Sequence, residues 1–285
     1  MKLPRLAHPI VARSIVARPI VARPIVASVA VIAASIAVVT AHPAAGEEYL
    51  NGIRWEAPPV VDPGEDDHSP PSDAVVLFDG TDKSHWVGAE KWTVEDGQLV
   101  AGKGSIRSVE QFGDCQVHLE WSAPEPGGLT GQNRGNSGLF FLNTYEIQIL
   151  DSYESPTYHD GQAGAIYKQT PPMANAMRPP GRWNTYDVIW TNPRFDSDGN
   201  LTSPAAMTAI HNGVVILNHF ELQGDTPYDR PPRYTDVGSR GPLGLQDHNS
   251  PVRFRNIWVR ELAPAAGERE RPAFIRDGDV ERPIE

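Results

Sequence analysis

The stretch TYEIQILDS, residues 144–152, carries carboxyl and amide side chains at a spacing that could do chemistry. Glu146 and Gln148 occupy alternate positions, and Asp151 follows three residues later. In a regular strand Glu146 and Gln148 share a face while Asp151 points away. One extra residue at Ile149–Leu150, a β-bulge, would bring all three onto one surface. Two carboxyl groups on one surface are what acid–base cleavage of a glycosidic bond requires.

Each of these acidic residues also has a structural interpretation. Asp151 begins the segment DSYESP, and Asp is a favoured first residue of a turn. Glu146 could be an outward residue in contact with water. The sequence alone leaves both interpretations open, and the position of Asp151 relative to Glu146 decides between them.

The segments that would position these residues read as strands, one after another, from residue 74 onward. The run CQVHLEW is the clearest case, because apolar and polar residues alternate with a period of two. We expect one face to point into a core and the other, formed by Gln116, His118 and Glu120, to point outward. The inward residues are Cys115, Val117, Leu119 and Trp121.

Two dipeptides mark tight hairpins between such strands, Asp96-Gly97 and Asn212-Gly213. Many short strands with turn residues between them predict an all-β fold, a two-sheet antiparallel sandwich or a barrel. If one sheet curves, its outer face becomes a trough, which suits a sugar that offers hydroxyl groups and C–H faces. Seven Trp and eight Tyr residues fit such a trough and fit core packing equally well.

The chain has four predicted parts. Residues 1–46 combine basic residues, an apolar run and small residues near Gly46, as in a secretory signal peptide, so we expect export to the periplasm or the extracellular space. The alternative is an uncleaved single-span anchor, which would be the chain's contact with a membrane. Residues 47–72 read as a Pro- and acid-rich linker or arm, residues 73–262 as the folded domain, and residues 263–285 as an exposed tail.

The charge balance argues against a nucleic-acid partner. Residues 1–46 hold five basic and no acidic residues, so the remainder has 20 basic against 36 acidic side chains and a formal charge of −16. Phosphate contacts need a basic surface, so a neutral ligand such as a carbohydrate is favoured. Cys115 is the single cysteine, which excludes an internal disulfide. The oligomeric state stays open.

Several segments in order resemble one family. They are VVLFDGTDKSHW, WTVEDGQLVA, NSGLFF, YEIQILDS, GAIYKQTPP, RPPGRWNTYDVIW, HNGVVILNH and GPLGLQDHNSPVRFRNIWVREL. From Ala74 to Leu262 the chain is similar to the 3-keto-disaccharide hydrolase domain family. The resemblance implies an all-β, two-sheet antiparallel jelly-roll sandwich of the concanavalin A-like type, related to laminarinase-type glucanases.

The segment EIQILD is also similar to the laminarinase pattern E-I-D-x-x-E, with Gln148 in place of the middle Asp and Asp151 in place of the final Glu. The family resemblance implies another route for cleavage. A ketone at C3 of a sugar acidifies the C2–H, a base removes that proton, the leaving group departs from C1, and water adds back. Such an enzyme needs a base, donors around the enolate oxygen, and an acid.

We assign candidate roles from this chemistry. Glu146 or Asp151 would serve as base or acid, Lys168 would stabilise negative charge, and His248 lies in a polar loop before the last strand. These four are the predicted catalytic residues. The predicted substrate-binding residues supply amide, phenol or guanidinium groups: Gln148, Tyr167, Arg178, Asn184, Tyr186 and Gln246.

No cofactor is predicted. The sequence shows no zinc-type His/Cys spacing, phosphate loop or dinucleotide fingerprint, although the oxygen-rich loop around His159-Asp160 leaves a divalent metal open. Two other functions remain possible alternatives on the same fold: a non-catalytic carbohydrate-binding module and a plain retaining β-glucanase. The binding module differs from the first in whether Glu146, Asp151, Lys168 and His248 converge in one trough. The separation of the Glu146 and Asp151 carboxyl groups tests the β-glucanase.

Overall fold

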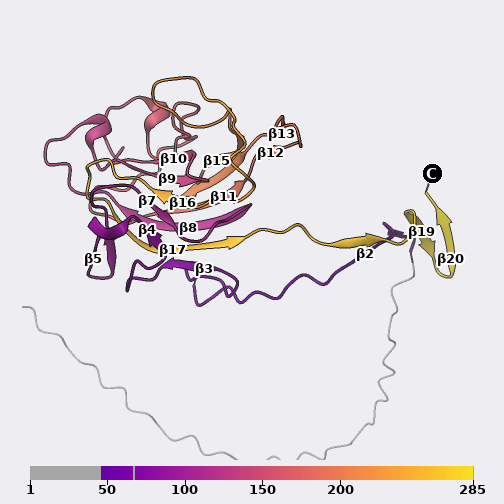
Figure 1. Ribbon diagram of the computed structural model, residues 1–285. Helices are drawn as coiled ribbons and strands as arrows, with labels where there is room; N and C mark the ends of the chain where they lie inside the picture. The colour runs from indigo at the N-terminus through magenta and orange to yellow at the C-terminus, as the bar shows by residue number, and fades with distance from the viewer. Residues whose placement is uncertain (1–45, 67, 285) are drawn as a thin grey trace, which may run out of the picture. The chain divides into compact units, whose positions relative to one another are not determined.

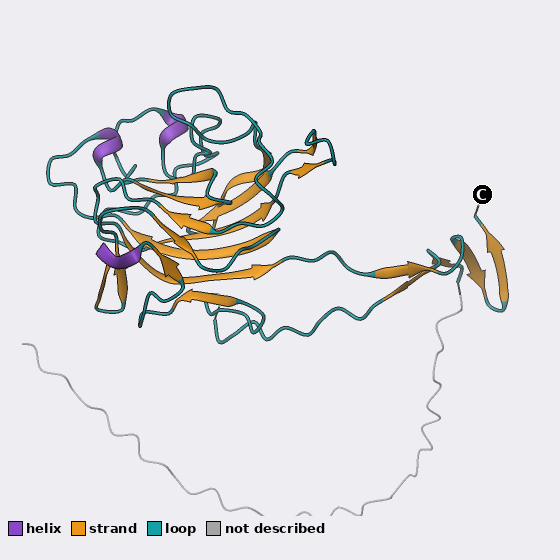
Figure 2. Cartoon of the chain, in the orientation of Figure 1, coloured by secondary structure: helices purple, strands orange, loops and turns teal. Residues whose placement is uncertain are grey.

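The computed structural model describes residues 46–66 and 68–284, so the predicted signal peptide lies outside the described residues apart from Gly46. The described chain is almost entirely strand and loop, with three short 3-10 helices and no α-helix (Figure 2). These helices are η1 (Ala89–Lys91), η2 (Gly131–Asn133) and η3 (His159–Gly161). Over the same residues, no helix is long and apolar enough to cross a membrane.

Two antiparallel sheets form the body of the fold, as the sequence predicts (Figure 1). The smaller sheet has the strand order β10–β9–β16–β7–β4. Its strands are β4 (Trp86–Val87), β7 (Ile106–Ser108), β9 (Ser137–Phe141), β10 (Tyr145–Ile149) and β16 (Leu243–Leu245). Strand β10 is therefore an edge strand, so neighbouring loops can line a pocket beside it.

The larger sheet has the order β15–β14–β11–β8–β17–β6–β5, and β3 also pairs with β17. Its strands are β3 (Val75–Phe78), β5 (Thr93–Glu95), β6 (Gln98–Val100), β8 (Cys115–Ser122), β11 (Asn184–Thr191), β14 (Ala206–His211), β15 (Val214–Glu221) and β17 (Arg253–Glu261). A small hairpin, β12 (Arg194–Phe195) and β13 (Leu201–Ser203), lies outside this order. Both predicted hairpin turns are present, since β5 pairs with β6 and β14 with β15.

The two sheets are held together by aromatic packing and a buried hydrogen bond. Trp190 on β11 stacks on Phe141 of β9 with ring centroids 4.8 Å apart and lies 5.3 Å from Tyr145 on β10. The Tyr186 hydroxyl on β11 donates to the backbone carbonyl of Gln148 at 2.8 Å. Such contacts between inward-facing residues of two sheets define a sandwich rather than a barrel.

Strand β8 shows both the success and the limit of the alternation pattern. Cys115, Val117, Leu119 and Trp121 are fully buried in the core, as predicted. The outward prediction for His118 and Glu120 needs correction, because they are only 0% and 7% exposed. They do lie on the outer face of the sheet, but side chains of β17 and the segment around His68 cover them.

The segments at the two ends of the described chain form strands despite their lack of apolar periodicity. The chain divides into two compact units, and the larger, residues 53–271, contains the sandwich and the pair β2 (Ile53–Trp55) with β18 (Gly267–Arg269). The described parts of the smaller unit, 46–52 and 272–284, form a three-stranded sheet. Its strands are β1 (Glu48–Leu50), β19 (Phe274–Asp277) and β20 (Val280–Pro283). Backbone pairing needs no apolar alternation, so sequence periodicity could not predict them.

Candidate active site

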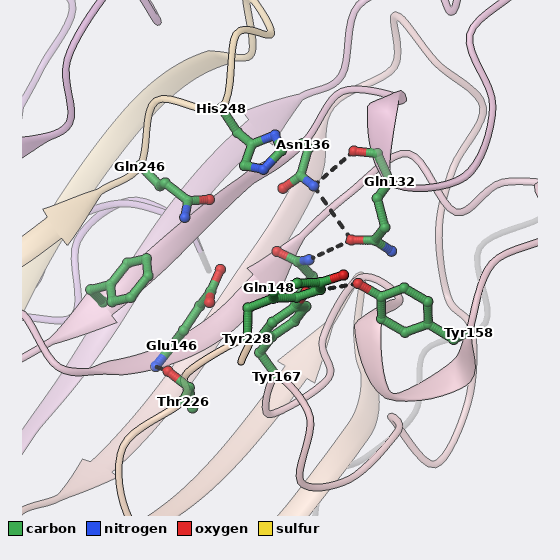
Figure 3. A pocket seen from close by; sticks show the side chains of 11 residues that line it. Gln132, Asn136, Glu146, Gln148, Tyr158, Tyr167, Thr226, Tyr228, Gln246 and His248 are labelled. Atoms are coloured by element: carbon green, nitrogen blue, oxygen red, sulfur yellow. Dashed lines mark hydrogen bonds between the residues drawn. The ribbon is translucent and has the colours of Figure 1, made fainter. Parts of the chain in front are cut away.

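A pocket of about 470 Å³ lies on the outer face of the smaller sheet, at its β10 edge (Figure 3). Strands β9 and β10 form part of its wall, and four loops complete it. The lining residues are Gln132, Asn136, Phe140, Glu146, Gln148, Tyr158, Tyr167, Thr226, Tyr228, Gln246 and His248. Five of the residues predicted from sequence meet here: Glu146, Gln148, Tyr167, Gln246 and His248.

Glu146 and Gln148 share the outer face of β10, as predicted from their spacing, and the neighbouring strand makes room for Glu146. Gln148 lies opposite Gly138 of β9, and Glu146 lies opposite Phe140. A Cβ atom at Gly138 would lie 2.3 Å from a Glu146 carboxylate oxygen, so any side chain there would displace the carboxyl group. The absence of a side chain at Gly138 therefore lets the Glu146 carboxyl group extend across β9 into the pocket.

The Glu146 carboxyl group is buried and lacks a charged partner. The residue is 5% exposed, and its carboxylate makes no hydrogen bond within residues 46–66 and 68–284. Burial disfavours the charged form and raises the pKa of Glu146 to about 8. A carboxylate with such a pKa binds a proton far more strongly than an exposed one, which suits a general base that works near neutral pH.

Amide groups line the wall beside Glu146. Gln148 Nε2 donates to Gln132 Oε1 at 3.2 Å, and Asn136 Nδ2 donates to the Gln132 backbone carbonyl at 2.8 Å. Gln132 is anchored in turn, because its Nε2 donates to the Gly161 carbonyl at 2.9 Å. Gln148 Oε1 is buried without a hydrogen-bond partner among the described residues. A bound ligand with a hydroxyl group could supply the missing donor.

Phenol rings line the pocket next to these amide groups (Figure 3). The hydroxyl groups of Tyr158 and Tyr167 share a hydrogen bond of 2.7 Å. Lys168 Nζ lies 3.6 Å from the centroid of the Tyr158 ring and 6.0 Å from that of Tyr228. Lys168 does not itself line the pocket, so its predicted catalytic role lacks the required placement. Its ammonium group instead holds the rings of the wall by cation–π contact and lies 4.0 Å from the Asp160 carboxylate.

Two loops from distant parts of the chain are fastened to the strands of the pocket. The Thr226 hydroxyl accepts the backbone N–H of Glu146 at 3.1 Å, which ties the loop after β15 to the edge strand. The backbone N–H of Gln246 donates to the Gly138 carbonyl at 3.0 Å. This second loop also carries His248, whose side chain is exposed and directed toward the pocket (Figure 3).

The prediction that Asp151 joins Glu146 on one surface is wrong. Strand β10 pairs with β9 in unbroken register up to its end at Ile149, without the expected bulge. Asp151 is fully buried, and its Oδ2 accepts two bonds from Arg134, at 2.6 Å from Nη2 and 2.9 Å from Nε. Its other oxygen accepts the backbone N–H of Tyr153 at 3.2 Å. Asp151 therefore fixes a turn next to the pocket and does not line it.

Three predicted substrate-binding residues also lie elsewhere. Asn184 and Tyr186 on β11 are fully buried between the sheets. Asn184 Oδ1 accepts the Arg178 backbone N–H at 3.0 Å and an N–H of Asn212 at 2.8 Å. The Arg178 side chain donates to the Trp183 carbonyl at 2.7 Å. Asn184 and Tyr186 therefore stabilise the sandwich core, because their hydrogen-bonding groups are already used within the protein. Arg178 is exposed and contacts the rim beside them.

Six lining residues were missed by sequence reasoning: Gln132, Asn136, Phe140, Tyr158, Thr226 and Tyr228. Most of them lie in long loops without periodicity, so no strand pattern could assign them a face. One signal was available for Phe140. Phe140 lies two residues after Gly138 on β9, so both residues are on the same face of the sheet, and Phe140 pairs directly with Glu146 of β10.

The pocket combines one carboxyl group with amide, phenol and imidazole groups. Glu146 is the single carboxylate among the lining residues that the structure describes. Amide and hydroxyl groups match the donors and acceptors of a neutral polar ligand, and aromatic rings match its apolar faces. The arrangement can therefore bind a neutral polyhydroxylated molecule and remove one proton from it.

Fold and pocket together define a class of protein, a two-sheet β-sandwich with a polar and aromatic pocket on an outer sheet face. Residues 73–260 match the family model of the 3-keto-alpha-glucoside-1,2-lyase-like domain, and the chain belongs to this family. The curated 3-keto-disaccharide hydrolase of Bacteroides thetaiotaomicron is 24% identical over 227 residues, which cover 66% of this chain and 78% of that protein.

Solved structures agree with the fold. A crystal structure from Parabacteroides distasonis, described as that of a candidate glycosyl hydrolase, is 46% identical with a TM-score of 0.70. The match covers 73% of this chain and 94% of that one. A second structure from the same organism, 23% identical with a TM-score of 0.50, covers 67% of this chain and 94% of its own and supports the fold alone.

Proposed function

We propose that the protein is a glycoside-cleaving enzyme that acts on sugars with a ketone at C3, by elimination followed by addition of water. The observation that carries this proposal is the buried, unpaired carboxyl group of Glu146 in a pocket of neutral polar groups. Membership of the 3-keto-alpha-glucoside-1,2-lyase-like family and the relative named 3-keto-disaccharide hydrolase support a carbohydrate substrate of this kind.

The number of carboxyl groups in the pocket argues for elimination. Retaining and inverting glycosidases both place two carboxyl groups around the scissile bond, about 5 Å or about 6.5–9.5 Å apart. Glu146 is the one carboxylate among the described lining residues, and Asp151 is paired with Arg134. A C3 ketone makes a second carboxylate unnecessary, because it acidifies the neighbouring C2–H so that a single base can start the reaction.

The reaction balances without a cofactor. The Glu146 carboxylate takes the C2 proton, and the electron pair forms an enolate across C2, C3 and the ketone oxygen. The enolate re-forms the ketone, makes the C1=C2 double bond and expels the aglycone oxygen from C1, which takes up a proton. Water then adds to C1 while C2 regains a proton. The sum of the steps is hydrolysis of the glycosidic bond.

The neighbouring groups have roles that follow from this sequence. The second N–H of Gln148 Nε2 is a suitable donor to the enolate oxygen, because an oriented amide donor stabilises a developing negative charge. His248 at the pocket entrance is suited to protonate the leaving oxygen. Tyr158 and Tyr167 offer ring faces for the C–H surface of the sugar.

The discriminating experiment compares a 3-keto-glucoside with its unoxidised parent. We expect release of the aglycone from the keto sugar alone. Release from both would support a plain β-glucanase, and binding of either sugar without release would support a carbohydrate-binding module. In D₂O the sugar product should carry deuterium at C2, above the exchange seen without enzyme. Product without deuterium would indicate direct displacement at C1 and would contradict the elimination.

The pH dependence follows from the raised pKa of Glu146. The base acts only when it is ionised, so the acidic limb of the kcat/KM profile should rise about tenfold per pH unit until pH reaches about 8. A general acid for the leaving group would add a separate fall at higher pH. Initial rates at low substrate concentration, measured from pH 5 to 10, would check this. A profile already level from pH 5 upward, as expected for an ordinary Glu with a pKa of about 4.3, would show that the essential base is a different, exposed carboxylate.

A further inference from the structure

A second group of side chains lies on the opposite outer face of the sandwich, away from the pocket. His118 and Glu120 project from the outer face of β8, and His68 lies in the segment that crosses that face. One ligand atom from each of the three residues lies within 4.8 Å of the others. None of the three lines the pocket described above. The mechanism proposed above gives this group no role.

His118 is oriented as metal-binding histidines are. Its Nδ1 lies 2.7 Å from Oδ1 of Asp187, its direct partner on β11. Its ring is fully buried and stacks on Trp258, with centroids 5.2 Å apart and an interplanar angle of 11°. When Nδ1–H donates to Asp187, Nε2 is left with a lone pair. Nε2 is buried and has no hydrogen-bond partner among the described residues. A carboxylate behind the imidazole in this way is the usual support of a zinc ligand.

Glu120 offers an oxygen on the same side. Its Oε1 lies 3.9 Å from His118 Nε2, close enough for both atoms to bind one ion after a small shift. Arg255 binds the other oxygen, Oε2, at 2.7 Å. Asn256 Nδ2 donates to Oε1 at 3.0 Å and leaves that oxygen a further lone pair. The carboxylate is thus oriented by its neighbours while one lone pair stays available.

The third residue is brought in by backbone contacts. The His68 carbonyl accepts N–H bonds from Asn256 Nδ2 at 2.9 Å and from Trp258 Nε1 at 3.2 Å. Asn256 has a φ of 47° where the register between β17 and β8 shifts, and this irregularity directs its side chain to both His68 and Glu120. The His68 ring lies 5.6 Å from that of His118, and the residue is exposed, so its imidazole can adjust to an ion.

We propose that His68, His118 and Glu120 bind a divalent transition-metal ion, best matched by Zn²⁺, that fastens the segment around residue 68 to the larger sheet. Two imidazoles and one carboxylate, with water as the fourth ligand, are a common tetrahedral zinc set. Ca²⁺ and Mg²⁺ prefer oxygen ligands and fit poorly. The role is structural and independent of the proposed catalysis, because the site lies on the sheet face that does not form the pocket.

A proton is the rival occupant of His118 Nε2. Burial lowers the pKa of His118, but the hydrogen bond to Asp187 and the negative charge of the nearby Glu120 carboxylate outweigh it and raise the pKa to about 9. A protonated His118 between two carboxylates would satisfy the same atoms without a metal. The experiment must therefore measure the metal itself.

The test uses tag-free protein that has been treated with EDTA and freed of the chelator. Titration with ZnCl₂, followed by calorimetry and metal analysis, should give one zinc per chain, and zinc should raise the Tm. Co²⁺ should give the visible spectrum of a tetrahedral site. The exposed His68→Ala variant should fold, weaken zinc binding more than about tenfold, and lose the Tm shift. His219→Ala, which changes an exposed histidine elsewhere, should behave as the parent.

Three outcomes would overturn the proposal. The first is an EDTA-treated parent protein that binds no zinc and shows no Tm shift. The second is a His68→Ala variant that binds zinc as tightly as the parent. The third is a Tm shift produced by CaCl₂ and not by ZnCl₂, which would show an oxygen-ligand site elsewhere. Since every readout is binding or stability, failure of the proposed glycoside cleavage would leave this test unaffected.

Discussion

Replacement of Glu146 by Gln is expected to lower kcat/KM on a 3-keto-glucoside by about 10²–10⁴-fold, the usual contribution of a positioned general base. Gln has nearly the same shape and fills the same space over Gly138. It cannot accept the C2 proton, so the step that starts the elimination is lost. Binding of the keto sugar, measured by calorimetry, should persist, because the amide and phenol walls are unchanged.

Two controls make the result specific. Glu221→Gln changes an exposed glutamate at the end of β15 and should leave kcat/KM unchanged. The second control is stability. Because the pKa of Glu146 is raised in the folded state, ionisation of this group disfavours folding progressively as pH rises from the unfolded value through about 8. Glu146→Gln should therefore unfold at a higher temperature than the parent at pH 9. Full activity of this variant would remove Glu146 from the mechanism.

The sequence predicted the fold because the strands carry their own pattern. In β8 the apolar residues recur at every second position, and the core side of that strand is buried as expected. Asn212-Gly213 sits at a turn where both residues have positive φ, 52° and 81°, which few other pairs accept. Strand patterns and turn residues of this kind can be recognised without knowing which distant segments of the chain they contact.

The same local reasoning found half of the site. Glu146 and Gln148 share a face because alternate residues of any strand do, and His248 lies in the polar loop predicted before the last strand. The other half depends on long-range contacts. Tyr158, Thr226 and Tyr228 reach the pocket through loops that are held by long-range hydrogen bonds, such as that between Thr226 and the Glu146 backbone. No spacing in the sequence shows such a bond.

Asp151 failed as a prediction for the same reason. The sequence did not distinguish a turn residue from a catalytic residue, because the two roles differ only in which group contacts the Asp151 carboxylate. That group is the Arg134 guanidinium, 17 residues earlier in the chain. The two bonds from the Arg134 guanidinium occupy lone pairs of the Asp151 carboxylate. The residue is thus polar, buried and close to the pocket, yet its hydrogen-bonding capacity is already used.

Loss of the ion pair between Asp151 and Arg134 is expected to have the second large effect, on the stability of the fold. Asp151→Asn should lower the free energy of unfolding by about 3 kcal/mol, because it leaves the largely buried Arg134 guanidinium without its counter-charge. Asn can still accept the Tyr153 backbone N–H, so the turn itself should survive. Urea unfolding measures the loss, and kcat/KM per folded molecule should change little.

Comparison of the two variants distinguishes a residue that takes part in the reaction from one that stabilises the structure near the pocket. Glu146→Gln should lose activity without any loss of stability, whereas Asp151→Asn should lose stability and keep activity. A double change, Arg134→Met with Asp151→Leu, should recover part of the lost stability, because an apolar pair of similar volume can replace a buried ion pair. An Asp151→Asn variant with native stability and a loss of kcat/KM as large as that of Glu146→Gln would place Asp151 in the reaction. It would also restore a two-carboxylate mechanism for this pocket.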